Sequence, residues 1–224
     1  MHTILQGDVL QRAELEVLHA DDPVAGFWGE PWRRAAAGEP VTTGDAARRR
    51  TAAHLDSLAR LLAVAGWSDA AARARWLRDD VLAGAHAGAV MPRLRRLARR
   101  LRGSRTLLWL TDGLGVLPAA TAAAAGVAVS TLRASRCGGD AHARWRSWLA
   151  DIEQALPDVD DTGPLPVGSA APRGPLAGDG HSAAVLDVLP GLLQGVELAT
   201  ARLVVASLDP DLAELGTHAE VRDG

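Results

Sequence analysis

Arginine is concentrated in one stretch of this 224-residue chain, and a dense array of guanidinium groups suits the binding of a polyanion. Between Arg93 and Trp148 there are eleven arginines and only two acidic residues, Asp112 and Asp140, so the stretch carries a net charge of +9. Because the whole chain carries −3, the remainder carries −12. The chain contains no lysine, asparagine or tyrosine, a usage typical of a very GC-rich genome. Such a coding bias supplies arginine everywhere and does not by itself segregate it.

The densest part of the basic stretch predicts an amphipathic helix over Arg93–Arg102. Its apolar residues recur at helical spacing and form one stripe: Leu94, Leu97, Ala98 and Leu101. Five arginines of the remaining surface are candidates for contacts with phosphates or with an acidic protein partner: Arg95, Arg96, Arg99, Arg100 and Arg102. A solvated helix face, or a face that pairs with acidic parts of the same protein, explains the pattern of this helix equally well.

The segment Leu117–Arg136 has the spacing of two helices joined by a tight turn. Pro118 pre-sets the first turn of a helix, and Ala122 is small enough for a second helix to approach closely. Gly126 supplies the positive φ of a tight turn, and Leu132 would turn back onto the first helix. This segment resembles the helix-turn-helix of bacterial repressors, in which a small residue, a glycine four positions on and an apolar residue six beyond define the motif.

The resemblance covers about 20 residues and implies a DNA-binding protein, a transcriptional regulator that acts on duplex DNA, commonly as a homodimer on paired half-sites. In that family the residues at the start of the second helix reach base edges in the major groove. By resemblance these residues are Ser130, Thr131, Arg133 and Arg136. Two further arginines, Arg144 and Arg146, would be available for phosphates.

Two glycines within Thr111–Gly115 interrupt the helix that should precede this motif, and they leave a second interpretation open. Three apolar runs could instead form a small parallel sheet in an α/β fold: Leu107–Leu110, Val127–Leu132 and Leu203–Leu208. Ligands of such folds bind at the carboxyl ends of strands, so Asp112 and Asp209 would be the site candidates of a nucleotide- or small-molecule-binding enzyme. The sequence contains no complete phosphate-loop or dinucleotide fingerprint.

Helical patterns dominate the rest of the chain, so the sequence predicts a mainly α fold with a central basic helix-turn-helix-like unit. A helix capped by Thr43 or Asp45 should run to about Ala65, and a second helix beyond Gly66 should complete an αα-hairpin. Asp8–His19 also has the pattern of an amphipathic helix, and a last strong helix is expected from Asp140 to about Leu156. Four tryptophans are expected in the core: Trp67, Trp76, Trp145 and Trp148.

Composition divides the chain into four consecutive parts. These are an N-terminal helical region (1–91), a basic helix-turn-helix-like region (92–156), a Pro/Gly-rich linker or long loop (157–181) and a small C-terminal unit (182–224). The flanking helical parts would serve dimerisation or contact with a partner.

Several classes of function are disfavoured by the sequence. Cys137 is the only cysteine, which rules out an internal disulfide and a cysteine-based zinc site, and no other motif predicts a metal or a cofactor. No apolar run is long enough to cross a bilayer, and the first residues lack a signal-peptide pattern, so a cytoplasmic protein is expected. DNA binding is the leading hypothesis. The alternatives are the α/β enzyme and a non-catalytic adaptor whose Arg93–Arg102 helix docks on an acidic partner.

Overall fold

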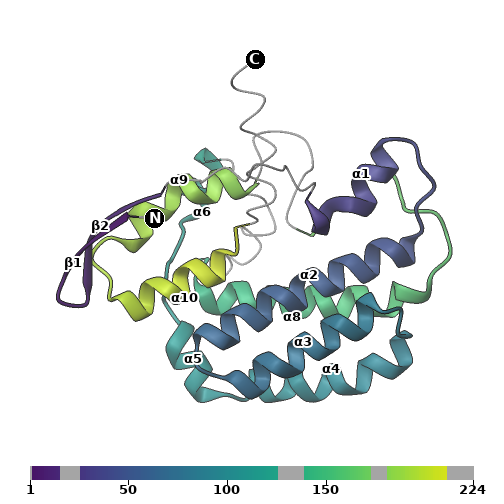
Figure 1. Cartoon of the computed structure of the whole chain (residues 1–224), viewed down its shortest axis with the longest axis horizontal. Coiled ribbons are helices and arrows are strands. Elements are labelled where there is room, and N and C mark those ends of the chain that lie inside the picture. The colour runs from purple at the N-terminus through teal and green to yellow at the C-terminus, as the bar shows by residue number, and fades with distance from the viewer. Residues whose placement is uncertain (1, 16–25, 126–138, 173–180, 211–224) are drawn as a thin grey trace. The chain divides into compact units, whose positions relative to one another are not determined.

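The computed structural model describes residues 2–15, 26–125, 139–172 and 181–210, and it is mainly helical (Figure 1). The chain clusters into two compact units, each assembled from separate segments. The hairpin unit comprises Met1–Phe27, Thr111–Arg144 and Arg173–Gly224, and the bundle unit comprises Trp28–Leu110 and Trp145–Pro172. Among the described helices, none combines the length and the apolar character needed to cross a lipid bilayer.

The predicted mainly α class is confirmed, and the α/β alternative is wrong. Two of its three expected strands are helices, α5 (Arg105–Thr111) and α10 (Leu198–Leu208), and the third, Val127–Leu132, lies outside the described residues. A missed cap explains α5, because the Ser104 hydroxyl accepts a hydrogen bond from the Leu107 amide at 3.1 Å and so starts a helix there. The glycines at 113 and 115 follow this helix and do not interrupt it.

The central element of the bundle unit is the helix α2 (Thr43–Val64). It begins with a capping box in which the Thr42 hydroxyl accepts from the Asp45 amide while the Asp45 carboxylate accepts from the Thr42 amide. Its leucines are fully buried, and Gly66, at φ +78°, ends the helix before α3 (Ser68–Leu82) packs back along it. The predicted αα-hairpin is therefore confirmed, with Thr42 as the cap in place of Thr43.

The arginine-rich helix α4 (Ala87–Arg102) buries the predicted stripe of Leu94, Leu97, Ala98 and Leu101. It starts at Ala87, six residues before the predicted start at Arg93. The reason is a cap supplied from far along the chain: the Asp160 carboxylate accepts from the Ala87 amide at 3.0 Å. This bond holds the pKa of Asp160 below its ordinary value, and His86 and Arg48 act in the same direction. A carboxylate at this position also interacts favourably with the positive end of the helix dipole.

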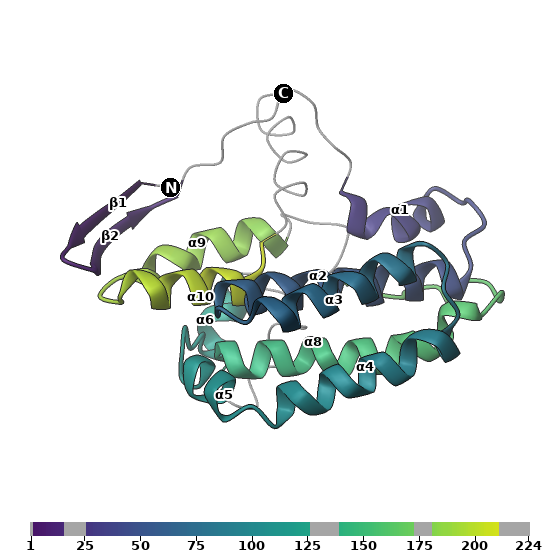
Figure 2. The same ribbon diagram turned by 60° about the horizontal axis from the view of Figure 1, so that its bottom comes forward.

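The remaining elements of the bundle unit are the short helix α1 (Glu30–Ala36), preceded by η1 (Phe27–Gly29), and the helix α8 (Ala141–Ala155), which continues into η3 (Leu156–Asp160). The assignment to the two units changes within α8, after Arg144. The predicted helix from Asp140 is confirmed, and it buries Trp145, Leu149 and Ile152. In Figure 2, α8 runs alongside α2, α3 and α4.

The first half of the Pro/Gly-rich stretch is a loop bound to the bundle. The amides of Thr43 and Gly44 donate to the carbonyls of Gly163 and Asp161, each at 2.8 Å, and the Leu165 amide donates to Val41 at 2.9 Å. The first two bonds satisfy amides in the first turn of α2, which have no partner inside the helix. The loop backbone therefore lies within hydrogen-bonding distance of the first turn of α2.

The hairpin unit contains an antiparallel pair of strands, β1 (His2–Gln6) and β2 (Val9–Glu14), so the helix predicted over Asp8–His19 is wrong for its described part. A register shift opposite Ile4 and Leu5 marks a bulge in β2, which leaves Gln11 without a partner. The bulge brings Leu10 and Ala13 to the same buried face. A spacing of three residues on one face imitates the period of a helix, and this produced the error.

The core of the hairpin unit joins β2 to the helices α6 (Ala119–Ala124), α9 (His181–Leu193) and α10. Its fully or almost fully buried members include Leu10, Ala122, Val185, Leu189 and Val204. The turn between α9 and α10 pairs with β2, because the Leu10 amide donates to the Val196 carbonyl at 2.9 Å and the Gly195 amide donates to the Leu10 carbonyl at 2.7 Å. The short hairpin is thus held by backbone bonds as well as by apolar packing.

The close approach of the loop to α2 can be tested at Gly44. A Cβ there would meet the carbonyl oxygens of Asp161 at 2.6 Å and Val159 at 2.8 Å. Gly44→Ala should therefore lower the free energy of unfolding by about 1–3 kcal/mol, measured by urea denaturation followed by circular dichroism. Gly88 holds the same second position in α4 and has open space around it. Gly88→Ala should leave stability unchanged or raise it by up to about 1 kcal/mol, and equal losses in both variants would contradict the packing argument.

Candidate nucleic-acid interface

The arginines of α4 fall into two groups, and the first group is neutralised inside the protein. Arg93 pairs with Asp80 and Arg100 with Asp69, both on α3, and Arg100 also lies 5.0 Å from the ring centre of Trp67. Arg102 binds Glu153 of α8 with two hydrogen bonds of 2.9 and 2.6 Å, a bidentate arrangement. The hydrogen bond from Arg100 holds the pKa of Asp69 below its ordinary value. Of the five predicted contact residues, Arg100 and Arg102 thus already have acidic partners.

The second group of arginines is exposed. Arg95, Arg96 and Arg99 lie on the solvent side of α4, opposite its buried stripe, and Arg105 lies at the start of α5. Within the described part of the chain, none of the four has an acidic partner. The helices α4 and α5 follow one another along one edge of the bundle unit (Figure 2). We call these four residues the arginine face.

An exposed indole accompanies the arginine face. Trp109 leaves 78% of its surface accessible, and it follows Arg105 by four residues, so the two side chains share one face of α5. Sequence reasoning did not single out Trp109, although its i+4 relation to an arginine was a readable signal once α5 was known to be a helix. Exposed aromatic rings among arginines are a feature of surfaces that bind single-stranded nucleic acid by stacking.

The other tryptophans divide between core and surface. Trp145 is buried, as predicted, and Trp67 and Trp148 are half-buried. The prediction for Trp76 is wrong, because 59% of its surface is exposed on α3. The buried positions of that helix are taken by alanines, Leu77 and Val81, which leave the outer side to Trp76.

The helix-turn-helix-like segment is described only at its beginning. Pro118 stands immediately before α6, and Ala122 is 1% exposed within the core of the hairpin unit. The residues expected to reach bases lie outside the described residues: Ser130, Thr131, Arg133 and Arg136. Their role stays a prediction.

Arg144, one of the two arginines expected to contact phosphates, is 2% exposed and is therefore a structural residue. Its guanidinium donates to the Ser207 hydroxyl at 2.8 Å and to the carbonyls of Gly115 and Gly139. Burial lowers the pKa of Arg144 to about 10, and the charge of Asp140 opposes that shift. The group is consequently still cationic at neutral pH. Arg146, two residues on, is exposed as expected.

Hydrogen bonds join the two ends of the chain segment that contains the helix-turn-helix-like sequence. The Gly113 amide donates to the Asp140 carboxylate at 2.7 Å, and the Ala141 amide donates to the Leu114 carbonyl at 2.9 Å. Gly139, at φ +64°, lies so close to Leu117 that a Cβ would come within 2.8 Å of the Leu117 carbonyl oxygen. Together with Arg144, these bonds hold the chain before α6 next to the beginning of α8.

The alternative ligand site loses its basis, because it required strands before Asp112 and Asp209. Asp112 is exposed just after α5, and Asp209 caps the end of α10 in the left-handed conformation, at φ 52°. Both preceding segments are helices. Over the described ranges, no three histidine, cysteine or acidic side chains gather as a metal site would require.

The chain matches no protein-family model, and no curated protein is significantly similar to it in sequence.

The structural role of Arg144 predicts a large effect of its removal. Arg144→Met leaves the buried Asp140 without its cationic neighbour and two carbonyls without a donor, so the free energy of unfolding should fall by about 3–5 kcal/mol in urea denaturation. Arg146→Met removes the same charge two residues away on the exposed side of α8. This control should change stability by less than about 0.5 kcal/mol. A loss in the Arg144 variant no larger than in the control would show that the buried network does not stabilise the hairpin unit.

Proposed function

We propose that this protein binds duplex DNA through phosphate contacts made by the arginine face. The supporting observation is that Arg95, Arg96, Arg99 and Arg105 stay exposed, without an acidic partner among the described residues, in a chain whose net charge is −3. The same helix neutralises three other arginines with carboxylates of α3 and α8. Acidic residues are therefore abundant nearby, yet this side of α4 is left cationic.

The cationic side of α4 carries a physical cost that a polyanion removes. Arg95 and Arg99 are four residues apart, and Arg96 and Arg99 are three apart, so like charges are neighbours on the helix surface. Each such pair destabilises a helix by about 0.2–0.5 kcal/mol. Phosphates would relieve this repulsion, and the counterions released from DNA would add to the affinity.

Base recognition is assigned to the helix-turn-helix-like segment Leu117–Arg136, with Ser130, Thr131, Arg133 and Arg136 at the base edges. Two observations support it: the burial of Ala122, where the motif requires a small packed residue, and the hydrogen-bonded closure around Gly139. Residues that recognise base edges must be held in position by a rigid part of the structure. The proposed biological role is a cytoplasmic transcriptional regulator that acts as a homodimer.

An acidic protein surface is the second candidate partner of the arginine face, as in an adaptor or assembly protein. The observation in its favour is that arginines of the same helix already bind carboxylates, most closely in the pair Arg102–Glu153. The two partners differ in one respect, because DNA binding should depend on salt with a slope set by the number of phosphates contacted.

The phosphate contacts can be tested with two double variants of α4 that remove the same charge. Arg96→Ala with Arg99→Ala should weaken duplex DNA binding and reduce the slope of log K against log salt by about 2, measured by fluorescence anisotropy. Arg93→Ala with Arg100→Ala removes arginines that are already paired, and it should change the slope much less. Absence of binding to duplex DNA at low ionic strength would contradict the proposal. Retained DNA binding with loss of a protein complex would favour the adaptor.

The proposed contact of Arg133 with a base edge predicts a loss of sequence specificity and not a uniform loss of affinity. Arg133→Ala should relax base preference at one position of the selected site and cost about 1–3 kcal/mol there, measured by selection from a random duplex library followed by anisotropy. The Arg96, Arg99 variant should weaken binding to all sequences alike. If the unaltered protein selects no sequence, the helix-turn-helix assignment fails while the phosphate contacts of the arginine face can still stand.

A further inference from the structure

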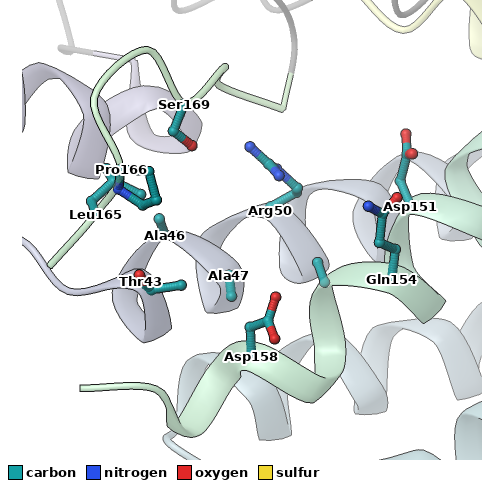
Figure 3. A pocket seen from close by; sticks show the side chains of 11 residues that line it. Thr43, Ala46, Ala47, Arg50, Asp151, Gln154, Asp158, Leu165, Pro166 and Ser169 are labelled. Carbon is teal, nitrogen blue, oxygen red and sulfur yellow. The ribbon is translucent and has the colours of Figure 1, made fainter. Parts of the chain in front are cut away.

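We infer that the bundle unit has a second binding site, a cavity for a small zwitterion of the amino-acid type, which is independent of the proposed DNA binding. The cavity measures about 220 Å³ and lies between α2, the α8–η3 segment and the loop that follows η3 (Figure 3). Its polar lining consists of Thr43, Arg50, Asp151, Gln154, Asp158 and Ser169.

Small side chains leave the space, and fixed walls keep it open. Ala46 and Ala47 on α2 and Ala155 on α8 line the cavity with methyl groups only. The opposite wall is the loop, whose position is set by the hydrogen bond from the Trp32 indole to the Ser169 hydroxyl at 3.2 Å, in addition to the backbone bonds described above. A cavity whose walls are held by such bonds is formed before any ligand enters.

Arg50 is the strongest argument for an occupant. Its side chain is partly buried against Trp32, with the guanidinium 5.4 Å from the ring centre, and burial lowers its pKa, a shift that Asp151 opposes. A guanidinium has five N–H groups. One donates to the Ala170 carbonyl, and among the described residues no other acceptor bonds to the rest. A partly desolvated cation with several unused donors is suited to a carboxylate.

The opposite charge lies elsewhere in the same cavity. Figure 3 shows the Arg50 guanidinium directed toward the loop of Ser169, whereas the Asp158 carboxylate rises from η3 below it. Asp158 has no side-chain partner within the described chain, and the Gln154 amide is likewise unused. A group with N–H donors, such as an ammonium, would satisfy both. Asp151 adds a second carboxylate to the lining.

Charge and size together select the class of ligand. One arginine and two aspartates disfavour a phosphate dianion, and the arginine disfavours a simple cation. An apolar molecule would leave the polar groups without partners. The volume lies below the range of about 300–1,000 Å³ typical of sites for larger ligands. A molecule that carries a carboxylate and an ammonium on a short carbon chain fits both limits.

The experiment is a saturation-transfer NMR titration of the full chain with L-alanine, β-alanine and 4-aminobutyrate. At least one zwitterion should bind, and propionate and propylamine, which carry one charge each, should bind at least tenfold more weakly. Arg50→Gln and Asp158→Asn should each weaken zwitterion binding at least tenfold. Asp187→Asn, an exposed change in the hairpin unit, should have no effect.

Circular dichroism of each variant checks that it is folded. If the Arg50 variant unfolds, zwitterion binding by the variant of the exposed Asp158 tests the proposal. No binding of any of the three zwitterions would overturn the proposal. Equal binding of the zwitterions and the singly charged molecules, or unchanged binding by the Asp158 variant, would also overturn it. None of these outcomes bears on DNA binding, because none of the cavity residues belongs to the arginine face.

Discussion

Burial of α2 is the constraint on which the bundle unit depends. Most of its apolar residues are buried, and Leu55, Leu58, Leu61 and Leu62 are completely inaccessible, whereas a narrow side that includes Asp45, Arg60 and Ala63 faces solvent. A helix with so wide a buried face must be covered by several elements. The covering includes α3 and the segment η3 with its loop, which comes so near that only a glycine fits at position 44. The cavity around Arg50 lies where α2 presents Ala46 and Ala47 in place of larger apolar side chains.

The same covering determines which arginines are available to a partner. The carboxylates of Asp69 and Asp80 come from α3, and that of Glu153 comes from α8, so each neutralises the side of α4 that it adjoins. The side of α4 that points away from both helices keeps its charge. A count of charges along the sequence gives +9 for the basic stretch but does not distinguish these sides, because the pairing residues are distant along the chain. The arginine face is a product of packing.

Sequence reasoning succeeded where the signal is local and periodic. The buried stripe of α4, the αα-hairpin and the helix after Asp140 follow from apolar residues at helical spacing and from nearby caps. It failed where distant contacts decide. Asp160 caps α4 from a distance, so the helix starts earlier than its apolar pattern predicts. A bulge at Gln11 gives the buried residues of β2 the spacing of a helix. Arg144 was taken for a surface contact because a single sequence does not reveal that Gly115, Gly139 and Ser207 converge on it.

Arginine is the only basic residue besides histidine in this chain, so it has to fill several physical roles, and burial separates them. Arg144 is desolvated and has acceptors together with a nearby aspartate, which makes the buried charge tolerable and the local structure rigid. The exposed arginines remain hydrated, so a partner can bind them at little desolvation cost. Arg50 lies between these cases, because it has lost part of its water and gained one carbonyl. A cation in that intermediate state is less well satisfied than one in either extreme, and an incoming carboxylate is the group that would satisfy it best.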